Sequence, residues 1–148
     1  MPRDLPHPDY DAEFYEGVPT KRAVAWVIDF VICLIAAAAL TLVLGILTIG
    51  VGFFFFPAIY FLIAFFYRFT TIADRSATWG MSFTGIELRG RTGQRLDPLQ
   101  AALHTGIFMF LMASLIGWAA TVAAILLTRY HQGVPDLLLG TTAINRPA

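Results

Sequence analysis

The sequence lacks most of what a soluble enzyme or a nucleic-acid-binding protein would need. Cys33 is the only cysteine and lies in an apolar run, which excludes a disulfide framework, a thiolate metal cluster and a CxxC redox pair. Charged residues make up only 14% of the 148 positions and the formal net charge is zero, so no basic excess would attract nucleic acid. Zincin, serine-hydrolase and P-loop motifs are missing too. We therefore expect no enzyme activity, no cofactor and no metal.

Apolar residues, in contrast, are abundant. They make up 57% of the chain, and the mean hydropathy is +0.69. A single water-soluble domain of this length could not cover so much apolar surface. The composition predicts an all-α integral membrane protein whose main partner is the lipid bilayer.

The first long apolar run is interrupted by one charge. Between Ala23 and Tyr67 the sole formally charged residue is Asp29. The run that follows it is almost twice the length of about 20 residues that one membrane helix needs, and glycines cluster near its middle. We predict a transmembrane helical hairpin with helices at about 23–44 and 53–69.

Basic residues indicate how this hairpin is oriented. Lys21, Arg22 and Arg68 flank its open end, whereas the predicted tip has no basic residue, which places the N-terminus in the cytoplasm. The apolar run begins too far from the start for an ordinary signal peptide, so the segment is expected to stay as an anchor. Residues 1–20, rich in acids and proline, are predicted to form a poorly ordered cytoplasmic tail.

Residues 70–97 form the most polar internal stretch and are predicted to be a cytoplasmic loop. Residues 83–89 alternate in polarity with a period of about two, and glycines follow before residues 94–96, which is the pattern of a β-hairpin. A hairpin alone is marginally stable in water, and residues 140–145 offer a further strand. The sequence thus predicts a small cytoplasmic β-element.

A third apolar segment covers residues 98–128. Asp97-Pro98 is typical of a helix N-cap followed by proline in the first turn. A straight helix of this length would measure about 45 Å, against a hydrocarbon core of about 30 Å. The segment is either one long span or two legs that bend near Gly117-Trp118. We favour the bend, which leaves every arginine on one side, although such legs are short for full crossings.

Asp29 is the most informative single residue. A carboxylate this far inside a membrane helix is costly unless it has partners, and it marks either an ion or proton site or a buried polar clamp. Arg22 lies seven residues earlier, about 10 Å away along the helix axis, so a third group must connect the two side chains. We favour the clamp, because no second acid lies within the apolar runs.

The order of Arg22, Asp29 and Asp136 points to a family. Their contexts, Lys21-Arg22-Ala23-Val24-Ala25-Trp26-Val27-Ile28-Asp29 and Asp136-Leu137-Leu138-Leu139-Gly140-Thr141, resemble the RDD family of small bacterial membrane proteins, named for one arginine and two aspartates. Residues 77–89 also resemble that family, although Trp79 replaces its usual proline and Met81 its usual lysine. The resemblance covers about residues 18–146 and implies a membrane domain over residues 21–146 in the bacterial inner membrane.

The resemblance leaves the molecular function open, because transport of unknown ligands has only been suggested for the family. One hypothesis is a transporter in which Asp29 exchanges a cation or proton while Arg22 and Asp136 tune its charge. The alternative is a membrane scaffold or accessory subunit in which these three residues are structural. A homo-oligomer or a membrane-protein partner is expected in either case. His104 and His131, the remaining titratable candidates outside the tail, are expected to be hydrogen-bonded packing residues.

Overall fold

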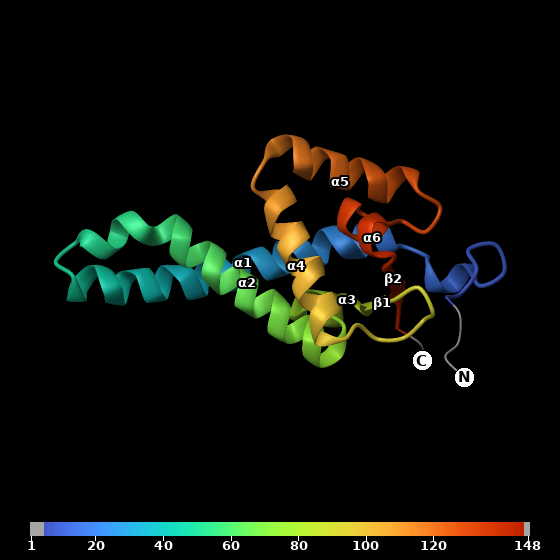
Figure 1. Cartoon of the computed structure of the whole chain (residues 1–148), viewed down its shortest axis with the longest axis horizontal. Coiled ribbons are helices and arrows are strands. Elements are labelled where there is room, and N and C mark those ends of the chain that lie inside the picture. Colours follow the sequence, from blue (N-terminus) through green and yellow to red (C-terminus); the bar gives the residue numbers. More distant parts are fainter. Residues whose placement is uncertain (1–4, 147–148) are drawn as a thin grey trace.

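The computed structural model describes residues 5–146 and is built mainly from helices (Figure 1). The elements in chain order are η1 (Ala12–Phe14), α1 (Val18–Leu47), η2 (Val51–Phe55), α2 (Phe56–Arg75), α3 (Trp79–Thr84), β1 (Ile86–Arg89), α4 (Pro98–Met112), α5 (Leu115–Leu127), α6 (Val134–Leu139) and β2 (Thr142–Asn145). The first and last described segments lie at the same end of the molecule, far from the tip of a long hairpin formed by α1 and α2.

The predicted hairpin is present, with longer helices than expected. The buried face of α1 repeats every four residues and consists mostly of small side chains: Ala25, Asp29, Cys33, Ala37, Thr41 and Gly45. Small residues at this spacing let a neighbouring helix approach closely. At the tip, Gly50 has a φ of +89°, and a Cβ on Gly52 would come within 2.7 Å of the Leu44 carbonyl carbon. Glycine therefore makes this tight turn possible.

The third apolar segment is bent, but not at the predicted place. The helix direction turns by 118° between α4 and α5. The break falls at Ala113 and Ser114, where the Ser114 side chain caps α5 by accepting a hydrogen bond from the Gly117 amide (3.0 Å). A Cβ on Gly117 would collide with the Leu111 carbonyl, so this glycine permits the bend without being its pivot.

The other end of α4 follows the sequence prediction. Asp97 accepts a hydrogen bond from the Gln100 amide (2.8 Å), and the Gln100 side chain accepts one from the Asp97 amide (3.2 Å). This reciprocal pair is a capping box, and Pro98 occupies the first turn. The start of α4 is thus determined locally.

The small β-element is a two-stranded sheet, but its strands are not those of a local hairpin. Strand β1 pairs antiparallel with β2 near the C-terminus, with Leu88 opposite Ala143. The predicted strand at 94–96 is absent, because the Leu96 amide donates instead to the Ser76 hydroxyl (2.6 Å). The start of the predicted 83–89 strand is the end of α3, which Thr78 caps. The pairing with residues 140–145 is the part of the prediction that is confirmed.

The N-terminal segment is more structured than predicted. Helix α1 already begins at Val18, inside the predicted tail. Before it, the Tyr15 side chain is buried and lies edge-on to the Tyr130 ring. Asn145 in β2 donates hydrogen bonds to the carbonyls of Glu13 and Glu16. These contacts attach residues 12–16 to the C-terminal strand, whereas residues 1–4 of the predicted tail lie outside the described part.

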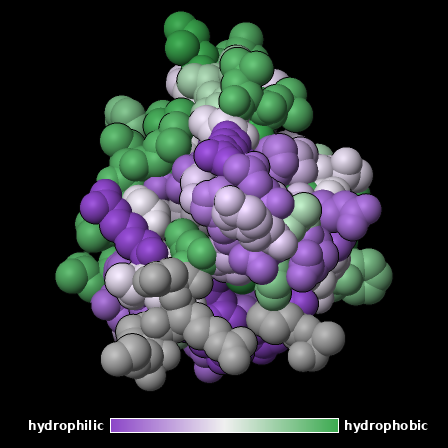
Figure 2. All heavy atoms as spheres, turned by 90° about the vertical axis from the view of Figure 1, so that its right-hand side faces the viewer, coloured by the Kyte–Doolittle hydropathy of each residue, from purple (hydrophilic) through white to green (hydrophobic). Residues whose placement is uncertain are grey.

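The molecule has a buried core at one end and long, apolar, largely exposed helices. The buried core, which includes Ile72, Ile86 and Leu88, lies where α1 meets α3 and the sheet. Two helical stretches are long and apolar enough to cross a membrane, 12–47 and 51–75, and the bent α4–α5 pair is a candidate third. Figure 2 looks at the end opposite the hairpin tip and shows hydrophilic side chains gathered there, with apolar ones around them. The helices and the pattern of exposure point to a membrane protein.

Candidate functional site

Asp136 is the centre of a buried charge cluster. Its carboxylate is fully buried and accepts hydrogen bonds from the Arg22 guanidinium (2.8 Å), the Thr141 hydroxyl (2.7 Å) and the Gly133 amide (3.1 Å). The Nε2 atom of His104 lies 2.8 Å from the Oδ1 atom of Asp136. These partners come from α1, α4 and both ends of α6, so one carboxylate joins three helices.

The surroundings of Asp136 stabilise its charged form. Burial acts to raise the pKa of the carboxyl group, but the Arg22 guanidinium, then the contact with His104 and the hydrogen bond from Thr141 outweigh it. The net result is a pKa well below the usual range. Asp136 is therefore an ionised member of a buried ion pair with Arg22.

Asp29 lies in a second, separate cluster. Its carboxylate accepts hydrogen bonds from the Tyr67 hydroxyl (2.6 Å), the Thr78 hydroxyl (2.6 Å) and the Gly80 amide (2.9 Å). These donors belong to α2 and to the start of α3, and all of them are neutral. The Asp29 charge is thus compensated by hydrogen bonds and by no ion pair between residues 5 and 146.

The segment that leads into α3 is shaped around Asp29. The Thr78 hydroxyl donates to Asp29 and also accepts the Met81 amide hydrogen (3.1 Å) as the N-cap of α3. A Cβ on Gly80 would collide with the Ala25 carbonyl and lie 2.8 Å from the Asp29 carboxylate. Only glycine lets α3 approach α1 this closely. Residues 78–80, noted in the sequence for their resemblance to a family motif, are therefore the support of the intramembrane aspartate.

The three residues singled out from the sequence do not form one triad. Arg22 and Asp136 are brought into direct contact, although 114 positions separate them. The helical spacing predicts that Asp29 and Arg22 do not pair directly, and in the structure they do not. The expected group that would connect the two is not seen among the described residues; Tyr67, Thr78 and Gly80 donate to Asp29 instead. The structure therefore contains an ion pair and a neighbouring hydrogen-bonded carboxylate.

Arg68 is the residue that sequence reasoning missed. The sequence places it at the end of a helix that is predicted to stop at position 69, whereas α2 continues to Arg75. Arg68 is only 7% exposed, and its guanidinium lies 3.7 Å from the centre of the Phe108 ring. Its Nε has no hydrogen-bond partner in the described part of the chain, and no carboxylate there forms an ion pair with it.

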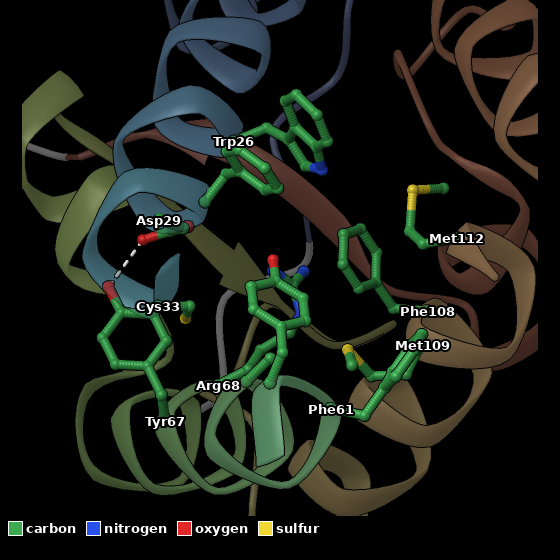
Figure 3. Close-up of a pocket in the computed structure, with 12 residues that line it drawn as sticks. Trp26, Asp29, Cys33, Phe61, Tyr67, Arg68, Phe108, Met109 and Met112 are labelled. Atoms are coloured by element: carbon green, nitrogen blue, oxygen red, sulfur yellow. Dashed lines mark hydrogen bonds between the residues drawn. The ribbon is translucent and has the colours of Figure 1, made fainter. Parts of the chain in front are cut away.

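Two adjoining cavities surround Arg68. The smaller, of about 170 Å³, lies among α1, α2 and α4, and Figure 3 shows its lining side chains converging from these three helices. The larger, of about 460 Å³, lies among α1, α4 and α5. Both are lined by five shared residues: Trp26, Asp29, Arg68, Phe108 and Met112. Arg68 and Asp29 therefore lie where the two cavities meet.

The two histidines have different partners. His104 is buried against Asp136, whereas His131 contacts the Ile125 carbonyl through Nδ1 (3.1 Å). Over residues 5–146 no group of three or more His, Cys, Asp or Glu side chains is placed to hold a metal ion. The polar groups of the site are therefore suited to hydrogen bonds and ion pairs.

Comparison with known proteins gives one match. The model of the RDD family matches residues 17–140, which include Arg22, Asp29, Arg68 and Asp136. No curated protein and no solved structure matches the chain. The matched range contains both hydrogen-bonded aspartates and most of the chain, and the chain accordingly belongs to the RDD family.

Proposed function

We propose that this chain is a transport protein of the membrane, which binds an ion or small ligand in the larger cavity. One observation carries the proposal: the buried Arg68 guanidinium faces a cavity of about 460 Å³ without an acceptor from the described residues. An unpaired buried charge costs several kcal/mol, so such groups generally have a partner or a function. A bound ligand would supply that partner.

The remaining charged residues have different roles in this proposal. The Asp136 carboxylate already has four hydrogen-bonding contacts and Asp29 has three, which leaves little capacity to coordinate a cation. Asp136 and Arg22 fix α6 against α1 and α4, and Asp29 fixes α3 against α1 and α2. Together they form the rigid surroundings of the cavity.

Flux across proteoliposomes tests transport. Vesicles that contain the purified protein and a dye specific for the ion under test are given gradients of protons, sodium, potassium, chloride or phosphate in turn. Wild type should exceed empty liposomes for at least one of them, and Arg68→Gln and Asp29→Asn should reduce that flux. Arg95→Gln, at an exposed position on the loop after β1, is the matched control and should leave it unchanged. Equal flux with wild-type and empty vesicles for every gradient would rule out ion transport.

A membrane scaffold or accessory subunit is the second candidate. The saturation of both aspartates by donors within the chain favours it, because saturated carboxylates serve packing. In this case Asp29→Asn and Arg22→Ala would lower the abundance of folded protein, a partner would copurify with the wild type, and no flux would be measured. A stable, partner-free protein that moves ions would exclude this candidate.

We also propose that the protein lies in the bacterial inner membrane with its charged end in the cytoplasm. The charge-free tip and the arginines at the opposite end support this orientation by the positive-inside tendency. The bend between α4 and α5 returns Arg129 toward that end. Reporters fused to each terminus and inserted after Gly50 test it. Cytoplasmic reporters should work at both termini, and an externally active reporter only at the tip.

A further inference from the structure

We infer that the larger cavity binds an anionic phospholipid, with the phosphate near Arg68 and Arg22 and an acyl chain against α5. The inference rests on the proposed function in taking this cavity as the ligand site, and it names the class of ligand. The chemistry required is an anionic oxygen group joined to an apolar chain.

The unpartnered hydrogen-bonding groups of the lining residues are two guanidinium donors and a hydroxyl, which can also donate. Arg68 and Arg22 both line the cavity, and each has one enclosed guanidinium nitrogen, Nε and Nη1 respectively, without a hydrogen-bond partner among residues 5–146. The Thr121 hydroxyl, from the facing helix α5, is the third such group, and its side chain is only 4% exposed. Guanidinium groups bind phosphate oxygens with charge-assisted hydrogen bonds, so this set suits a phosphate.

The charge at the cavity also favours an anion over a cation. Asp29 is the only acidic side chain that lines it, and three donors already surround that carboxylate. Arg22 shares its charge with Asp136, but Arg68 has no carboxylate in an ion pair with it. Met81 also lines this cavity and adds no charge to it. Arg68 is therefore the cation at the cavity that no carboxylate among the described residues pairs with directly.

The rest of the lining is apolar and fits an acyl chain. The α5 side of the cavity consists of Trp118, Val122, Ile125 and Leu126, apart from Thr121. Trp118 is 41% exposed and Leu126 is 63% exposed, so this wall continues onto the outer surface of the molecule. A free inorganic phosphate would leave such a wall uncovered, whereas a lipid would cover it. The volume of about 460 Å³ is within the usual range of ligand pockets.

Native mass spectrometry of the full chain in detergent micelles tests the inference. The probes are phosphatidylglycerol and phosphatidylcholine with identical acyl chains, and inorganic phosphate as a competitor. Both lipids carry the phosphate, but the choline ammonium of phosphatidylcholine adds a positive charge near the two arginines, so we expect phosphatidylglycerol to bind about tenfold more tightly. Arg68→Gln should abolish this preference, whereas the exposed control Arg95→Gln should keep it.

A second variant covers the case in which Arg68→Gln does not fold. Val122→Trp leaves both arginines in place and fills the apolar side of the cavity, and it should lower phosphatidylglycerol binding by about tenfold or more. Equal binding of the two lipids by wild type would overturn the inference. So would displacement of bound lipid by an equal concentration of inorganic phosphate, because the head group alone would then be the ligand.

Lipid binding and transport can fail separately. Selective binding of phosphatidylglycerol without any ion flux would support this inference and remove the proposed transport of ions. Ion flux in a protein that does not distinguish the two lipids would do the reverse.

Discussion

Asp136 and Asp29 are both buried aspartates saturated with hydrogen bonds, yet they lie in different surroundings. Asp136, in a short helix near the C-terminal strand, is paired with the Arg22 guanidinium. Asp29, inside the long apolar helix α1, is surrounded by hydroxyls and a backbone amide alone. The carboxylate inside the apolar helix is the one without a directly paired cation.

The comparison shows how each carboxylate charge is compensated and which cation remains without a directly paired carboxylate. A buried ion pair fixes both partners, and removing one leaves the other charge uncompensated. A carboxylate held by neutral donors leaves no directly paired cation behind when it is changed. Arg68 is then the cation that neither aspartate pairs with directly, which is why it carries the functional proposals.

The largest effect is expected from breaking the ion pair between Asp136 and Arg22. Asp136→Ala should lower the free energy of unfolding by about 3–5 kcal/mol, because Arg22 stays buried without its carboxylate. Denaturant titration in detergent micelles, followed by tryptophan fluorescence, measures it. The double variant Arg22→Met, Asp136→Leu should recover part of the loss. A double variant as unstable as the single one would contradict the uncompensated charge as the cause.

The next largest effect is expected from changing Asp29, which neutral donors hold. Asp29→Asn should cost about 1.5–3 kcal/mol, since the amide keeps one acceptor oxygen but loses hydrogen bonds to a charged group. Tyr67→Phe, which removes one donor, should cost less, and the two changes together should cost less than their sum. Strict additivity, measured by the same denaturant titration, would show that the 2.6 Å contact between these side chains carries no energy.

The third prediction uses pH to test the ion-paired carboxylate. The pKa of Asp136 is held below its usual range, so its stabilisation is present above the unfolded value of about 4 and is lost as pH falls below it. The loss should approach about 1.4 kcal/mol per pH unit. Asp136→Asn should have a shallower dependence below pH 4 than wild type. Parallel curves for the two proteins would contradict the assignment.

The smallest effect comes from an ion pair outside either cluster. Asp9 and Arg129 form a salt bridge, but both side chains are more than half exposed. Asp9→Ala should change the free energy of unfolding by less than about 0.5 kcal/mol, because water screens exposed pairs. A loss as large as that of Asp29→Asn would show that the docked N-terminal segment contributes far more than its exposure indicates.

Several features could be predicted because their causes are local. The Asp97-Pro98 cap is determined by Asp97 and Gln100, three positions apart, and the hairpin by the length of a charge-free run. The bend was predicted but misplaced, since Ser114 as a cap competed with Gly117 as a breaker. The 94–96 strand was wrong because a buried serine hydroxyl took its backbone amide.

Arg68 shows why the site could not be completed from the sequence. How deeply the Arg68 side chain is buried depends on where α2 ends, and the helix runs six residues beyond the predicted boundary. One signal was present: the pattern of Phe69, Ile72 and Ala73 continues the helical period past the arginine. The absence of an acceptor, however, depends on the positions of residues on other helices.

By itself the sequence determined the membrane class, the hairpin and the presence of a carboxylate within an apolar helix, because these follow from composition and from spacing along one segment. Only the tertiary structure decided that Arg22 pairs with Asp136, that Asp29 is held by residues 67, 78 and 80, and that Arg68 faces a cavity. The physical reason is that the compensation of a buried charge depends on distances of about 3 Å between side chains, and helices far apart in the chain supply those side chains.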